Sequence, residues 1–314
     1  MRLDHRSSIS SSTALLGALT MILVVGSTGR VGGMITRTLL GQDRQLRILV
    51  RPGSDYRAFT ATGAEASFGD LKDPASLAMA FREIDTVITT ASAGERGGDD
   101  TPQTVDLDGN ANLIEAARTA GVRQFIFISA LLARPDHPVP VPRAKALTEA
   151  ALHDSGLTYT IVAANGIADV MFPLVVGYPL SVGKPVTLVG EGRRRHTFIA
   201  ARDVAAFATA AIDHLAALNR RIEIGGPEAL SWRDVVAAHE RALGCTIPVQ
   251  WIAPGQLLPD LPPAPGLTQL VSGLMAALET FDTPLDMTEV SRTFGVTPTT
   301  IDELLRSRLV PLPR

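Results

Sequence analysis

Residues 21–33, MILVVGSTGRVGG, decide the fold of this chain. Residues 22–26 form an apolar, β-branched run typical of a buried strand, and glycines follow at the third and sixth positions after Gly26. Gly26 permits a tight turn, Gly29 lets the backbone approach a phosphate, and Gly32 lets a helix pack closely on the sheet. The free N–H groups at the start of that helix favour an anion. The stretch therefore predicts a strand, a turn and a helix that hold a dinucleotide phosphate.

The composition is typical of a globular protein without a basic surplus. The chain has 314 residues, of which 46% are hydrophobic, with 29 basic side chains against 32 acidic ones. Nucleic acid is therefore not an expected partner. Cys245 is the single cysteine, which excludes an internal disulfide and fits a reducing cytoplasm, where we expect the protein to lie. No apolar run has the length that spans a bilayer, so no membrane partner is expected.

Short apolar runs alternate with amphipathic stretches in the first half of the chain. The expected strands are residues 22–26, 46–51, 63–71, 85–91, 124–130 and 158–164. The expected helices are residues 30–40, 73–84, 108–122 and 142–156. This alternation predicts an α/β fold with a doubly wound parallel sheet, the Rossmann arrangement, covered by helices on both faces.

The pattern changes after residue 165. Residues 185–192 and 220–226 are typical of strands, and residues 201–215, 231–244 and 267–281 of helices. The proline-rich residues 251–266 are expected to form a surface loop. We expect three parts: a disordered extension at residues 1–20, a cofactor-binding Rossmann domain at 21–165, and a smaller mixed substrate-binding portion at 166–314.

Several motifs together resemble the short-chain dehydrogenase/reductase superfamily in its extended and atypical branches. They are the Gly-x-x-Gly-x-x-Gly turn, Gly-Asp-Leu at 69–71, the helix and strand at 111–130, and Asp-Val-Ala at 203–205. The resemblance covers nearly all of residues 21–310. The chain is similar to the NmrA-like atypical branch, which includes triphenylmethane-reductase-like and isoflavone-reductase-like enzymes as well as redox-sensing regulators.

The resemblance places a cofactor-selecting residue at the end of the second strand. NAD-binding members carry an acidic residue there for the ribose hydroxyls, whereas this chain carries Arg51. A guanidinium matches a 2′-phosphate with paired hydrogen bonds, so NADP(H) is expected over NAD(H). Arg30, inside the glycine turn, is a second candidate cation. The alternative for both is a solvated arginine.

The resemblance also implies the remaining cofactor contacts. Asp70 would face the adenine, and Thr89, Thr90 and Ala91 would run beneath the ribose nearest the nicotinamide, with Ser129 ending the fifth strand. The full set of expected cofactor-binding residues is Gly26, Ser27, Thr28, Gly29, Arg30, Val31, Gly32, Arg51, Asp70, Leu71, Thr89, Thr90, Ala91, Ser129 and Lys145.

The superfamily's catalytic Tyr-x-x-x-Lys pair is incomplete here. Lys145 stands at the lysine position, but Val141 occupies the tyrosine position, and Tyr56, Tyr159 and Tyr178 lie elsewhere. Two readings remain open. In a reductase, Lys145 would position the cofactor or protonate the product, since hydride transfer needs mainly proximity and orientation. In a redox sensor, the chain would bind NADP(H) without turnover and report to a protein partner.

Two further residues are candidates for the site. His137 follows the fifth strand in a loop and could donate a proton, although a solvated histidine is the alternative. Asn165 ends the sixth strand and is expected to line the substrate pocket. No cluster of His, Cys, Asp and Glu has metal-ligand spacing.

Taken together, these features favour an NADPH-dependent reductase of a small organic substrate such as a quinone, a dye or a conjugated natural product. Lys145 and His137 are its catalytic candidates, and a monomer or homodimer is expected. The alternatives are the redox sensor and an isomerase or epimerase.

Overall fold

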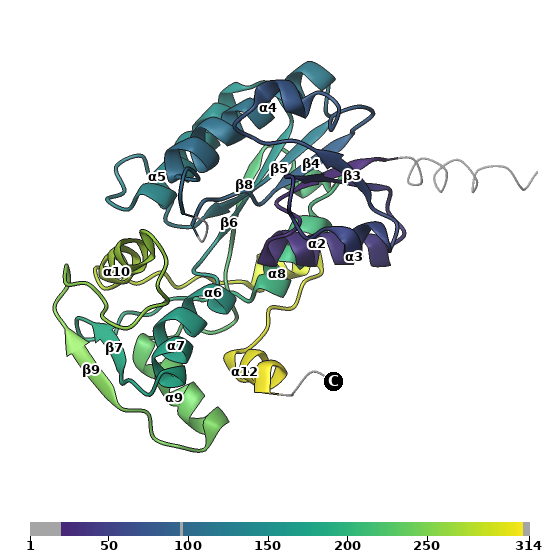
Figure 1. Cartoon of the computed structure of the whole chain (residues 1–314). Helices are drawn as coiled ribbons and strands as arrows, with labels where there is room; N and C mark the ends of the chain where they lie inside the picture. Colours follow the sequence, from purple (N-terminus) through teal and green to yellow (C-terminus); the bar gives the residue numbers. More distant parts are fainter. Residues whose placement is uncertain (1–19, 95–96, 310–314) are drawn as a thin grey trace, which may run out of the picture.

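A seven-stranded parallel sheet forms the centre of the larger lobe (Figure 1). The structure, a computed structural model, describes residues 20–94 and 97–309, so of the expected extension at 1–20 only Thr20 lies within the described residues. The strand order is β3-β2-β1-β4-β5-β6-β8. The strands are β1 (Ile22–Val25), β2 (Leu46–Val50), β3 (Glu65–Phe68), β4 (Thr86–Thr89), β5 (Gln124–Ala130), β6 (Tyr159–Ala164) and β8 (Arg220–Ile224). The doubly wound parallel sheet is therefore confirmed, and its winding reverses between β1 and β4, where such sheets bind ligands.

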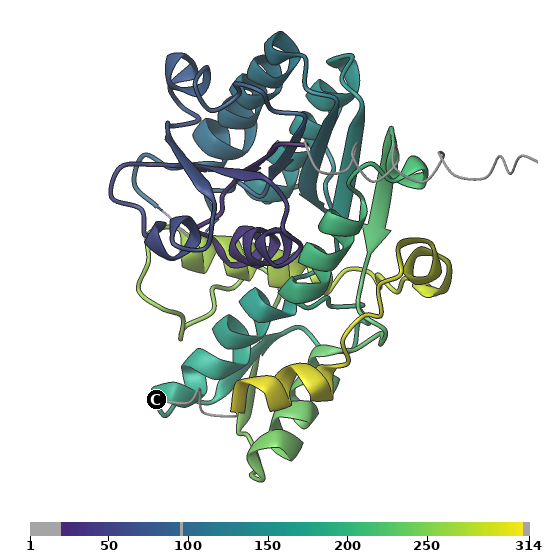
Figure 2. The same cartoon turned by 90° about the vertical axis from the view of Figure 1, so that its right-hand side faces the viewer.

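Helices cover both faces of this sheet and build a second lobe (Figures 1 and 2). The α-helices are α2 (Arg30–Gly41), α3 (Arg57–Thr60), α4 (Asp108–Ala120), α5 (Pro140–Asp154), α6 (Ala168–Phe172), α7 (Tyr178–Ser181), α8 (Ala201–Ala210), α9 (Trp232–Leu243), α10 (Leu267–Leu278), α11 (Thr288–Phe294) and α12 (Ile301–Leu309). The described residues also form the 3-10 turns η1 (Pro74–Leu77) and η4 (Leu215–Ala217) and the π-helices η2 (Pro102–Leu107) and η3 (Pro173–Gly177).

Alternating strand residues divide the larger lobe into two cores. Ile22 and Val24 are buried with residues of α2 and α8, whereas Leu23 and Val25 are buried with residues of α4 and α5. Figure 1 shows α4 and α5 on one side of the sheet and α2, α3 and α8 on the other. Successive strand side chains point to opposite faces, so a continuous apolar run is needed when both faces are covered.

The second lobe has a core of its own. Its parallel two-stranded sheet pairs β7 (Val186–Val189) with β9 (Val249–Ile252). Residues of α6, α9, α10 and α12 complete this core, with Phe172, Phe198 and Trp232 in edge-to-face or tilted contact. Trp251 and Ile252 belong to β9, so the expected loop at 251–266 begins inside a strand.

The later part of the chain does not form the second lobe alone. Strand β8 pairs with β6 at the edge of the main sheet, and α8 packs against α2. Residues on both sides of the expected boundary at 165 and 166 therefore share one sheet, because β6 still offers a free edge that a parallel strand can pair.

The helix expected at residues 73–84 is also corrected. Asp73 caps only the short η1 helix, and Glu83 adopts a φ of +60° that ends any helical continuation. Leu77, Ala80 and Phe81 are nevertheless buried, as helical spacing requires, because successive turns bring them to the same core.

Candidate active site

The glycine turn between β1 and α2 has no room for a side chain at Gly26 or Gly32. Gly26 has a φ of +84°, and a Cβ on Gly32 would lie 2.1 Å from the carbonyl oxygen of Gly26. Gly29 donates its N–H to the same oxygen at 2.9 Å and precedes α2 without any side-chain cap. The first amides of α2 are thus open to an anion, and the close backbone approach fits the pyrophosphate of a dinucleotide.

A small hollow beside β2 lies where the adenosine end of such a dinucleotide would bind. Its lining residues from the predicted set are Gly26, Thr28, Arg51, Asp70, Leu71 and Ala91. Arg51 donates to one oxygen of Asp100 at 2.8 Å, and Lys72 donates to the other at 2.8 Å. Lys72 directly follows the Gly-Asp-Leu motif, and this position could have identified it as a candidate site residue. Asp100 carries no local signal, and the sequence analysis missed both.

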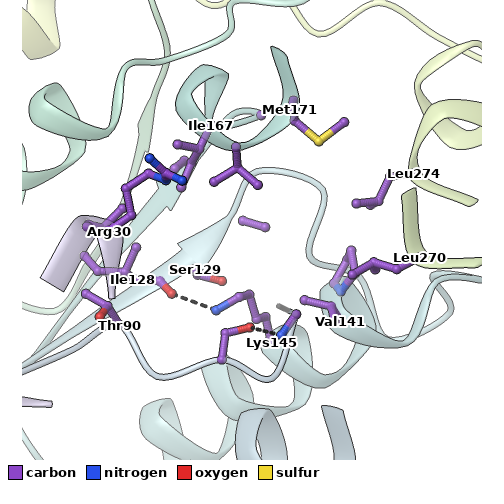
Figure 3. Close-up of a pocket in the computed structure, with 18 of the residues that line it drawn as sticks. Arg30, Thr90, Ile128, Ser129, Val141, Lys145, Ile167, Met171, Leu270 and Leu274 are labelled. Atoms are coloured by element: carbon purple, nitrogen blue, oxygen red, sulfur yellow. Dashed lines mark hydrogen bonds between the residues drawn. The ribbon is translucent and has the colours of Figure 1, made fainter. Parts of the chain in front are cut away.

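A larger cavity of about 560 Å³ extends from the glycine turn towards the second lobe (Figure 3). Its lining residues from the predicted set are Gly26, Thr28, Gly29, Arg30, Val31, Arg51, Thr90, Ser129, Lys145 and Asn165. Three of the predicted cofactor-binding residues, Ser27, Gly32 and Thr89, are buried and line neither hollow. Thr89 instead donates its hydroxyl to Asn110 at 3.2 Å, which is the packing role open to a buried threonine.

The far wall of this cavity is apolar and comes from segments distant in sequence. The wall residues are Val170, Met171 and Leu174 near α6 and Leu267, Leu270, Val271, Leu274 and Leu278 on α10. Figure 3 shows Arg30 at one end of the cavity and Leu270 and Leu274 at the other. The amphipathic pattern of α10 predicts a buried face but not its partner, so the sequence did not reveal this wall. Val141, at the expected tyrosine position, lines the same cavity and offers no hydroxyl.

Lys145 lies at the floor of the cavity on α5. Its ammonium donates to the carbonyl oxygen of Ile128 at 3.0 Å and stands 5.1 Å from the ring centroid of Phe127. The carboxylate of Asp106 lies 3.8 Å away. Burial lowers the pKa of Lys145, and the charges of Asp106 and Glu149 oppose that shift. The side chain is thus fixed in place and releases its proton more easily than a surface lysine.

Ser129, at the end of β5, is part of a second polar network. Its hydroxyl donates to Glu149, one turn after Lys145 on α5. The other oxygen of Glu149 accepts from Arg221 at 2.9 Å, and Arg221 also donates to the carbonyl oxygen of Ala130. The network fixes the Ser129 hydroxyl beside the cavity and ties α5 to β8.

Asn165 lies at the cavity, whereas His137 does not. Asn165 lines the cavity, but its amide donates to Thr283 and Thr197, so it shapes the wall and holds the second lobe. His137 is buried and does not line the cavity, and its Nδ1 accepts from the N–H of Val139 at 3.0 Å. Burial lowers the pKa of His137. His137 therefore lies outside the cavity, and its ring supports the start of α5.

The described part of the chain contains neither a metal-binding cluster nor a membrane-spanning helix. Within residues 20–94 and 97–309, no three or more His, Cys, Asp or Glu side chains gather where they could hold a metal ion. None of the helices in the same residues has the length and apolar character needed to cross a membrane.

The doubly wound sheet, the glycine turn at its switch point and the cavity beside it define a Rossmann-type dinucleotide-binding protein. The chain belongs to the NAD(P)H-binding family, whose model matches residues 26–215. This family match agrees with the NAD(P)H-binding class that the motifs implied.

Two relatives each match more than two thirds of this chain. The chain is 32% identical over 235 residues to the NAD(P)H azoreductase of Xenophilus azovorans, covering 74% of this chain and 77% of that protein. It is 31% identical over 226 residues to the photosystem II assembly factor Ycf39 of Synechocystis, covering 71% of this chain and 68% of the relative.

Solved structures share the fold. The NADPH-dependent quinone oxidoreductase QOR2 of Escherichia coli, complexed with NADPH, matches with a TM-score of 0.77 at 21% identity, covering 92% of this chain and 99% of that one. Leucoanthocyanidin reductase from Vitis vinifera with NADPH matches with a TM-score of 0.73 at 19% identity, covering 93% and 100% of the two chains.

Proposed function

We propose that this chain is an NAD(P)H-dependent oxidoreductase that reduces a small apolar acceptor such as a quinone, an azo or triarylmethane dye, or a conjugated natural product. The observation that carries the proposal is a single cavity lined at one end by the glycine turn and at the other by apolar residues of α10. Such a cavity brings a bound dinucleotide and an apolar substrate into contact. The relative named as an NAD(P)H azoreductase supports the same reaction class.

The residues present fit a dinucleotide along its whole length. The amides at the start of α2 would hold the pyrophosphate, and Asp70 and Leu71 would hold the adenosine end. Arg51 lines both hollows and would favour NADPH by bonding the 2′-phosphate. When bound, the reduced cofactor supplies a hydride to the substrate.

The chain's own groups position the reactants and move the proton. Lys145 would orient the ribose next to the nicotinamide, and its lowered pKa suits it to give a proton to the product. The Ser129 hydroxyl, held by Glu149, lies at the same part of the cavity. The apolar residues of α6 and α10 exclude water and orient the acceptor.

A second candidate function is binding of the dinucleotide without turnover, to report redox state to a protein partner. A relative named as a photosystem II assembly factor, at 31% identity, favours keeping this alternative. An isomerase or epimerase acting on a polar sugar fits the apolar wall less well.

The test measures NADPH oxidation by the purified chain against quinones, dyes and enones, in wild type and Lys145→Ala. We expect at least one acceptor to be reduced by the wild type, with turnover falling about 10²-fold or more in the variant. Tight binding of NADPH with no acceptor reduced would reject the oxidoreductase in favour of the non-catalytic alternative.

A further inference from the structure

An acidic side chain bridges two cations at the adenosine end of the cleft. Asp100 accepts from Arg51 through one oxygen and from Lys72 through the other, each at 2.8 Å. The Asp100 side chain is 8% exposed, whereas Arg51 and Lys72 are 38% and 32% exposed. The carboxylate is thus the inner member of the cluster, and both cations reach in to it from the surface.

The cluster lies where the cofactor would carry its distinguishing group. Asp100 and Arg51 line the same small hollow as Asp70 and Thr28, next to the glycine turn. NADP(H) and NAD(H) differ only in the phosphate on the adenosine ribose, so a charge in this hollow affects the binding of NADP(H) more than that of NAD(H). Asp100 comes from the segment before η2 and belongs neither to β2 nor to the glycine turn.

Among the described residues, acidic side chains offset the two cations that a phosphate would meet. The Arg51 and Lys72 cations are offset by Asp100 and by the neighbouring Asp70. A phosphate monoester carries about −1.5 to −2 charges at neutral pH. Burial alone would raise the pKa of Asp100, but hydrogen bonds from Lys72 and Arg51 outweigh it and lower the pKa to about 2. The carboxylate therefore stays ionised under ordinary conditions.

We propose that Asp100 is a cofactor-specificity residue: its carboxylate occupies the two cations that a 2′-phosphate needs, and so limits the preference for NADP(H) over NAD(H). This inference rests on the proposed dinucleotide-binding function. NADP(H) must compete with Asp100 for Arg51 and Lys72, and it meets like-charge repulsion from the carboxylate. NAD(H) presents only hydroxyls there, which a carboxylate accepts as hydrogen-bond donors.

The experiment measures the dissociation constants of NADP⁺ and NAD⁺ by calorimetry in wild type, Asp100→Asn and Asp99→Asn. Asparagine keeps the size of Asp100 and removes its charge. Asp99 is exposed, is the preceding residue and does not line the hollow, so its substitution is the matched control. Asp100→Ser replaces the asparagine variant if circular dichroism shows that the latter does not fold.

In Asp100→Asn, the affinity for NADP⁺ should rise about tenfold or more while that for NAD⁺ changes less than about twofold. The gain should shrink as salt is added, because the removed repulsion is electrostatic. Equal changes for both cofactors, or the same change in Asp99→Asn, would overturn the role of Asp100. No heat with either dinucleotide in the wild type would instead reject the proposed function itself.

Discussion

The ammonium of Lys145 lies 3.8 Å from the carboxylate of Asp106, and both groups are buried beneath the cavity. Lys145 comes from α5 and Asp106 from the π-helix η2, so the pair joins two elements that pack against each other. Asp106 is itself fixed by the N–H of Ala93, which donates to its other oxygen at 2.8 Å. Lys145, which has no tyrosine at position 141 beside it, is thus paired with the buried carboxylate of Asp106.

Lys145 should make the stability of the chain depend on pH. Burial lowers its pKa below the ordinary value of 10.5, so between the two values the unfolded chain binds more protons than the folded one. Stability therefore rises with pH through that window, and the full burial penalty applies only below it. Urea unfolding of wild type and Lys145→Met at a series of pH values up to 10.5 should show the free energy of unfolding rising with pH more in the wild type than in the variant.

The control for that experiment is Lys184→Met, which removes a lysine from an exposed position. Its free energy of unfolding should change with pH in the same way as that of the wild type. If the free energy of unfolding of Lys145→Met also followed that of the wild type with pH, the lowered pKa of Lys145 would be refuted.

Alanine substitutions at two glycines of α2, Gly32 and Gly41, should have opposite effects on stability. In Gly32→Ala, the new methyl group would meet the Gly26 carbonyl oxygen at 2.1 Å, so the turn must shift. We expect a loss of about 1–3 kcal/mol in the free energy of unfolding and a sharp fall in dinucleotide affinity. Gly41→Ala meets no atom within 4 Å and should stabilise the chain by about 0.4–1 kcal/mol. Thermal melts and calorimetry would measure both, and equal effects would contradict the close approach.

Arg51 should discriminate between the two nicotinamide cofactors. Arg51→Ala removes a charge-assisted contact worth about 1.5–3 kcal/mol, so NADPH should bind about 10- to 100-fold more weakly. NADH should lose less than about threefold, since it lacks the phosphate. Fluorescence titration with each cofactor measures this, with Arg57→Ala as a control at an exposed position outside both hollows. Matching losses for NADPH and NADH would remove the phosphate role.

Glu149 should matter for folding because it joins α5 to β5 and β8. It accepts from Ser129 and from Arg221, and the Glu149 side chain is only 14% exposed. Glu149→Gln should lower the free energy of unfolding by about 1–3 kcal/mol, since Arg221 loses a buried ionic acceptor. Glu115→Gln, in an exposed pair with Arg118, should leave the urea midpoint unchanged. A Glu149 variant as stable as the wild type would show that the network contributes nothing.

Leu274 separates substrate binding from cofactor binding. Leu274→Trp places a larger ring in the apolar wall, so kcat/KM for a bulky dye should fall about tenfold or more while the dissociation constant of NADPH stays within about twofold. Leu215→Trp, at a side chain that is 84% exposed, is the control. If NADPH affinity fell together with dye reduction, α10 would belong to the cofactor site and not to the substrate wall.

The sequence by itself determined the Rossmann core and the cofactor turn. Strand β1, Gly26 and α2 follow one another within twenty residues, and their pattern depends on local geometry: a buried run, a left-handed turn and a helix start. The same local logic placed Arg51 and Asp70 at the ends of neighbouring parallel strands, which meet at one edge of a sheet. Lys145 followed from its motif.

Only the tertiary structure decided which distant segments complete the site. Asp100 meets Arg51 across 49 positions of the chain, and α10 closes the cavity from the far end of the sequence. The same packing buries His137 away from the cavity and adds β8 to the main sheet. Periodicity shows that a side chain is buried or that a strand edge is available, but the partner is chosen by the packing of whole layers, which no local pattern contains.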